Sequence, residues 1–203
     1  MFVRALFCLA AFLLTVTATF AADKSIDLRA KDTAASASAP RRLALVVGNS
    51  AYRFSGALAN PASDAELMAK TLKAVGFQLH GGGAQVNLTR AALDQAIESF
   101  GDALRPGDVA LFYYSGHGLQ VNGENYLVPV DADIKKEAEV RVKTVPVNLL
   151  FAKLEGVKDA VNIVILDACR NNPFARSFRS SGGGLAAVNA PTGTIVAFST
   201  GPG

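Results

Sequence analysis

Two runs of apolar residues, 109–114 and 161–166, place the strongest constraint on the fold of this chain. Both are rich in aliphatic or aromatic side chains, as buried β-strands are. The first is apolar at almost every position, so both faces of its strand need cover. The two runs therefore predict central strands of a sheet that other elements cover on both sides.

Further strands and helices alternate around these two runs. Pro61 suits the first turn of a helix, and Thr89 suits the cap of another. Asn122-Gly123 predicts a tight turn between the strands of a small hairpin, 119–121 and 126–130. The other expected strands are 43–47, 77–80 and 194–199, with the third strand at 108–115, and the expected helices are 61–75, 90–104 and 146–154. This alternation predicts an α/β fold with a mainly parallel sheet and helices on both faces.

The 203 residues fit a single folded domain, preceded by two segments of different composition. Residues 1–22 resemble a signal peptide, with a positive charge, an apolar stretch and small residues at a cleavage site. Residues 23–40 are small and polar, which predicts a flexible linker before a domain at 41–203. We therefore expect an exported protein, periplasmic or secreted, with no membrane attachment after leader cleavage. The alternative is an uncleaved anchor, for which the apolar stretch is short.

Charge and cysteine content exclude several classes of function. The net charge is +3 and no block of Lys and Arg occurs, so nucleic acid is not an expected partner. Cys8 leaves with the leader, and Cys169 then has no partner for an internal disulfide. A redox protein would need a second cysteine. The two histidines, His80 and His117, lie too far apart for a typical zinc site, so no metal is predicted.

Polar residues follow the expected strands at 43–47, 108–115 and 161–166. Because the carboxyl ends of parallel strands share one edge of a sheet, Cys169 and His117 should meet there. An imidazole favours the thiolate and later protonates a leaving amine, so Cys169 is the candidate nucleophile and His117 the candidate acid and base. The backbone N–H groups of Gly118 and Cys169 are the candidate oxyanion hole. The plainer interpretation makes Cys169 a small buried hydrophobe.

These residues resemble the caspase-like cysteine peptidases (peptidase C14), and most of all the bacterial metacaspase-like proteins. The matching stretches are Leu43–Asn49, Asp64-Ala65, Tyr114–Gly118 and Asp167–Arg170. They include a histidine about 50 residues before a cysteine-arginine pair. The resemblance covers residues 41–203 and implies the three-layer caspase-hemoglobinase fold and endopeptidase activity. It also implies that the family's last strand and helix are missing from this chain.

The same resemblance implies a pocket for a basic side chain. The positions that match the metacaspase pocket are Asp64, Ser115 and Asp167, and two carboxylates would hold Arg or Lys by charge-assisted hydrogen bonds. We therefore expect protein or peptide substrates cleaved after Arg or Lys. The alternative is that Asp64 only favours its helix N-terminus and Asp167 only braces a loop.

Three further expectations concern cofactors, processing and activity. Family members often need calcium, but Asp131 and Asp133 present no coordination pattern, so no cofactor is predicted. The basic segment 174–184 is either a plain solvent loop or a site of self-cleavage after Arg176 or Arg179. The rival to an enzyme is a catalytically silent caspase-like interaction module.

Overall fold

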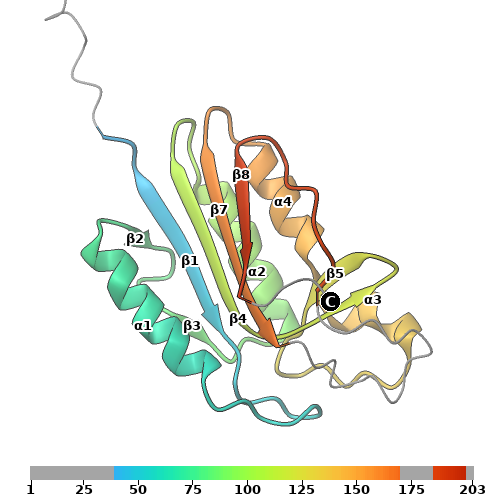
Figure 1. Ribbon diagram of the computed structural model, residues 1–203. Coiled ribbons are helices and arrows are strands. Elements are labelled where there is room, and N and C mark those ends of the chain that lie inside the picture. Colours follow the sequence, from blue (N-terminus) through green and yellow to red (C-terminus); the bar gives the residue numbers. More distant parts are fainter. Residues whose placement is uncertain (1–38, 170–184, 200–203) are drawn as a thin grey trace, which may run out of the picture. The chain divides into compact units, whose positions relative to one another are not determined.

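A parallel sheet forms the centre of the protein, whose computed structural model describes residues 39–169 and 185–199. Its main strands are β1 (Arg42–Gly48), β4 (Val109–Val121), β7 (Val161–Cys169) and β8 (Thr194–Phe198), in that order across the sheet (Figure 1). Two short strands, β2 (Gln78–Leu79) and β3 (Gln85–Val86), also pair in parallel with β1. The predicted mainly parallel sheet is confirmed.

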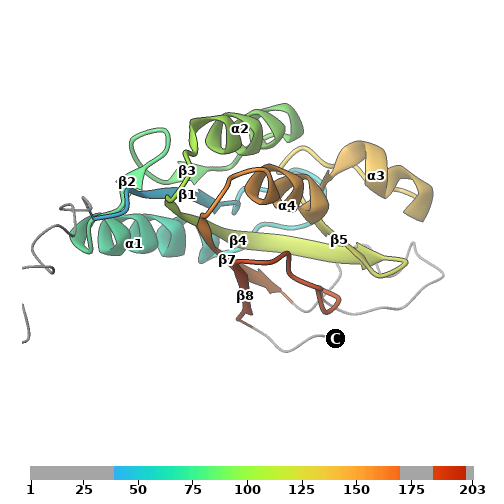
Figure 2. The ribbon, with the colours of Figure 1, turned by 90° about the horizontal axis from the view of Figure 1, so that it is seen from above.

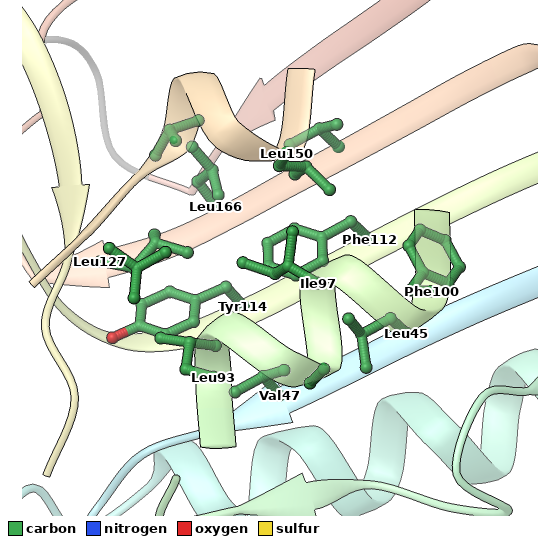
Figure 3. Packing of buried hydrophobic residues seen from close by; sticks show 14 of the residues in the cluster. Leu45, Val47, Leu93, Ile97, Phe100, Phe112, Tyr114, Leu127, Leu150 and Leu166 are labelled. Atoms are coloured by element: carbon green, nitrogen blue, oxygen red, sulfur yellow. The ribbon is translucent and has the colours of Figure 1, made fainter. Parts of the chain in front are cut away.

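Helices cover both faces of this sheet, as predicted. Helix α1 (Pro61–Ala74) lies on one face, and α2 (Arg90–Ala103) and α4 (Val147–Glu155) lie on the other (Figure 2). Figure 3 shows the larger core, where Ile97 and Phe100 of α2 pack with Phe112 of β4. A smaller core on the opposite face joins Ala65, Ala69 and Leu72 of α1 to alternate residues of β1 and β4.

Strand β4 is longer than the sequence predicts. We expected it to end at Ser115, but it continues to Val121 because a new partner takes over the hydrogen bonding. Pairing with β1 ends at Ser115, and antiparallel pairing with β5 (Glu124–Leu127) begins at Gly118. The predicted turn is confirmed: Asn122 and Gly123 both have positive φ, as a two-residue hairpin of this kind requires.

Several short elements escaped prediction because they are too short to show a hydrophobic period. These are β3, the 3-10 helix η2 (Glu137–Glu139), α3 (Val140–Lys143) and β6 (Val145–Pro146), which pairs with β5. The predicted signal peptide and nearly all of the predicted linker lie outside the described residues, as does segment 170–184 with Arg176 and Arg179. Within the described part, no helix is both long enough and apolar enough to cross a bilayer.

Candidate active site

The register of β4 and β7 brings the two candidate catalytic residues together. Cα pairing places His117 directly opposite Cys169, at the end of the ladder between these strands. Neighbouring strands lie about 4.8 Å apart, so residues more than fifty positions apart in sequence become adjacent. We expected both residues just beyond the strand ends, whereas both lie within strands. The reason is that pairing between β4 and β7 continues past the apolar runs to this last pair.

The imidazole of His117 is held in one orientation by the loop between β1 and α1. Its Nε2 lies 3.3 Å from the carbonyl oxygen of Gly56. Because a carbonyl can only accept, Nε2 carries the proton and Nδ1 is the basic nitrogen of the neutral ring. Nδ1 is buried and has no hydrogen-bond partner among the described residues.

Burial also sets the charge of His117, which is 6% exposed. Burial lowers the pKa of this imidazole, and hydrogen bonds to the backbone of Gly56 and Ser55 oppose that effect in part. The ring is therefore neutral at neutral pH and presents a lone pair at Nδ1. Such a group can take a proton from a thiol or return one to an amine.

Gly118 allows the chain to close tightly beside this pair. A Cβ at Gly118 would lie 2.9 Å from Ala168 Cβ and 2.9 Å from Leu185 Cδ2. The space beside this glycine is therefore filled by the protein itself and leaves no room for a ligand on that side. Gly118 follows the residue that pairs with Cys169, so the two backbone groups of the candidate oxyanion hole belong to adjacent strands.

The three candidate substrate-binding residues line one cavity. Asp64, Ser115 and Asp167 surround a volume of about 230 Å³. Asp64 lies in the first turn of α1, Ser115 lies in β4 at the last residue that pairs with β1, and Asp167 lies opposite Ser115 near the carboxyl end of β7. The remaining lining residues are Leu58, Ala59, Asn60, Pro61 and Gly116.

Among the described residues, no cationic side chain pairs with the carboxylates of this cavity. Oδ2 of Asp167 accepts hydrogen bonds from the Tyr113 hydroxyl and from Ser115 Oγ, each at 3.3 Å. Both donors are neutral, and no ion pair within residues 39–169 and 185–199 includes Asp64 or Asp167. Burial, together with the negative charges of Asp167 and Asp64, raises the pKa of Tyr113 to about 12. A cationic side chain is the natural complement of such a cavity.

Sequence reasoning missed two contributors to this site. Tyr113 stands two positions before Ser115, and alternate residues of a strand share a face, so the strand period already links them. No sequence pattern indicates Gly56, because its backbone carbonyl reaches His117 only through the conformation of the loop. In the described part of the chain, no group of three or more His, Cys, Asp or Glu side chains is arranged to hold a metal ion.

Comparison with known proteins identifies the family of this chain and several proteins that are similar to it. The family model for the caspase domain (Peptidase_C14) matches residues 41–203. The mucosa-associated lymphoid tissue lymphoma translocation protein 1 of Homo sapiens is 28% identical over 129 residues, and its Mus musculus homolog is 27% identical. The aligned region is 64% of this chain but only 15% of each of those proteins.

Two solved structures share the fold. A structural-genomics protein from Geobacter sulfurreducens has a TM-score of 0.50 and 24% identity, over 64% of this chain and 51% of that one. The structure of pro-sf-caspase-1 has a TM-score of 0.52 and 16% identity, over 81% of this chain and 63% of that one.

Proposed function

Since the chain belongs to the caspase-domain family of peptidases, we propose that it is a cysteine endopeptidase that cleaves peptide bonds after arginine or lysine. The observation that carries this proposal is the pairing of His117 with Cys169 across β4 and β7. A buried neutral imidazole on the strand residue that pairs with a cysteine supports a role in nucleophilic catalysis.

The proposed reaction proceeds through a thioester. Nδ1 of His117 accepts the thiol proton, and the sulfur of Cys169 attacks the carbonyl carbon of the scissile bond. The N–H groups of Gly118 and Cys169 stabilise the oxyanion. The imidazolium then gives its proton to the leaving amine as the C–N bond breaks, and water hydrolyses the thioester.

The acidic cavity supports the preference for basic residues. Asp64 of α1 and Asp167 of β7 both line it, and neither has a cationic partner in the described part of the chain. A substrate Arg or Lys would supply the missing charge. We further propose that the protein is exported, that residues 1–22 act as a signal peptide, that no cofactor is needed, and that its partners are protein or peptide substrates with basic residues.

Peptide hydrolysis by the purified protein tests this function. Fluorogenic peptides that differ only in Arg, Lys or Asp before the scissile bond should show hydrolysis of the first two. Cys169→Ala and His117→Ala should abolish it. Asp64→Asn and Asp167→Asn should each raise KM for the Arg peptide by about ten- to a hundredfold, because each loses one charge-assisted hydrogen bond.

The matched control is Asp102→Asn, which changes an aspartate on α2 whose side chain is 73% exposed. It should leave KM unchanged. Cleavage only after Asp would overturn the proposed specificity. No hydrolysis and no labelling of Cys169 by a thiol probe would instead identify a catalytically silent interaction module.

A further inference from the structure

A chain of hydrogen bonds through two buried tyrosines begins and ends on His117. The backbone N–H of His117 donates to the Tyr52 hydroxyl at 2.7 Å, and the hydroxyls of Tyr52 and Tyr114 lie 3.3 Å apart. The Tyr114 hydroxyl lies 2.8 Å from the carbonyl oxygen of His117 and 3.0 Å from that of Val128. Carbonyls only accept, so the single hydroxyl proton of Tyr114 is shared between these two oxygens, and Tyr52 is then the donor in the contact between the two hydroxyls.

Tyr52 also contacts the imidazole itself. The ring centroids of Tyr52 and His117 are 4.4 Å apart, with the planes tilted by 48°. Tyr52 belongs to the loop that also supplies the Gly56 carbonyl to Nε2. This loop therefore restrains the backbone, the ring face and one ring nitrogen of the same histidine.

Gly116 provides the space for both hydroxyls. A Cβ at this position would lie 2.5 Å from the Tyr52 oxygen and 2.8 Å from the Tyr114 oxygen. The glycine before His117 is thus required by the tyrosine pair, which sequence reasoning did not detect.

The two tyrosines differ in how replaceable they are. The carbonyl of His117 also accepts from the Val128 N–H, and the carbonyl of Val128 also accepts from the Asn49 side chain. Loss of the Tyr114 hydroxyl therefore leaves both carbonyls with a partner. The Tyr52 hydroxyl is the partner of the His117 N–H, and its loss would strand a buried donor.

We propose that Tyr52 and Tyr114 are positioning residues for His117, with Tyr52 the more important, and that they align the ring for proton exchange with Cys169. This inference rests on the proposed peptidase function. Errors of about 1 Å in such alignment can lower a rate about a hundredfold, so the effect should appear in kcat.

The test compares three substitutions that each remove one phenolic oxygen. Tyr52→Phe should lower kcat for the Arg peptide by about tenfold to a hundredfold, Tyr114→Phe should lower it less, and KM should stay within about twofold in both. The control is Tyr126→Phe. Tyr126 is 1% exposed and packs in the same apolar cluster as Tyr52, but its hydroxyl bonds to Glu124 and Arg141 and not to His117. Rates are taken per folded enzyme, well below the melting temperature, so that lost stability alone does not lower them.

A second measurement does not depend on peptide hydrolysis. The rate of Cys169 alkylation by iodoacetamide, followed by mass spectrometry of its peptide, should fall severalfold in Tyr52→Phe and in His117→Ala but not in Tyr126→Phe. If the wild type hydrolyses no peptide but this order holds, the proposed function fails and the positioning role stands. If Tyr52→Phe behaves like Tyr126→Phe in both measurements, the tyrosines only support the fold and the inference is wrong.

Discussion

His117 is a buried base whose charge state is set by its surroundings. Its Nε2 faces a carbonyl, its Nδ1 is enclosed, and burial lowers its pKa. A protonated imidazole is costly in such a place, whereas a neutral one is ready to accept a proton. The same burial that suits this residue to its proposed role should therefore make the protein sensitive to acid.

We expect the free energy of unfolding to decrease as the pH falls below about 6.5. The unfolded chain binds a proton at His117 near that pH, while the native imidazole resists until its own lower pKa is reached. The loss should therefore begin near the unfolded pKa and stop below the native one. Urea unfolding between pH 7.5 and pH 5 should show a smaller loss for His117→Gln than for the parent.

Cys169→Ala is the background for these measurements, since it removes any thiolate charge and any self-cleavage. His80 is a second contributor with the same sign, because burial lowers its pKa as well. His80→Asn measured in parallel separates the two. An identical acid response of His117→Gln and its parent would contradict the prediction.

The strands build the site by ending at different points along β4. Strand β1 stops pairing at Ser115, β7 at His117, and β5 begins at Gly118. At the carboxyl end of β1, the first turn of α1 packs directly against Gly48. Gly48 permits this contact, since a Cβ there would overlap the Pro61 carbonyl and lie 2.6 Å from Ala65 Cβ.

Gly48→Ala should therefore displace the start of α1 and, with it, the wall of the cavity that contains Pro61 and Asp64. We expect a loss of about 1–3 kcal/mol in the free energy of unfolding, the usual cost of overpacking. KM for the Arg peptide should rise as well. Gly83→Ala is the matched control, because a Cβ at Gly83 meets nothing within 4 Å. Equal behaviour of the two variants in denaturant titration would refute this account.

At the scale of the whole domain, hydrogen bonds connect the β4–β5 hairpin to the segment that precedes β8. The side chain of Asn125 on β5 donates to the carbonyl of Ala186 at 2.8 Å and accepts from its N–H at 2.7 Å. The adjacent Leu185 is buried in the larger core. Segments 61 positions apart are thus joined, and Leu185 lies against Gly118, the residue after His117.

Asn125→Ala should weaken the connection between the hairpin and the segment before β8. Both hydrogen-bonding groups of Ala186 lose their partner, so we expect a cost of about 1–3 kcal/mol in unfolding free energy and faster exchange of the Ala186 amide proton. Asn148→Ala, which removes a side-chain hydrogen bond to Glu124, the residue before Asn125 on β5, should change neither quantity appreciably. Unchanged protection of the Ala186 amide in Asn125→Ala would show that Leu185 alone holds the segment.

Much of this architecture was predictable from local patterns. The apolar runs at 109–114 and 161–166 indicated the central strands, and Pro61, Thr89 and Asn122-Gly123 marked the helix starts and the hairpin. Alternation of strands and helices then implied a parallel sheet with one working edge, at which the described acidic residues do line a single cavity. The short strands β3 and β6 were not predictable, because a strand of two residues is too short to show the alternation of apolar and polar side chains.

The amino-acid sequence by itself determined the order of the elements, the chemical types of the catalytic candidates and the sheet edge where they gather, because period, turn chemistry and strand direction are local properties. Only the tertiary structure decided that His117 faces Cys169 in register, that Gly56 orients its ring, and that Tyr52 and Tyr114 hold its backbone. Contacts of this kind join residues tens of positions apart, and they exist only once packing has brought those segments together.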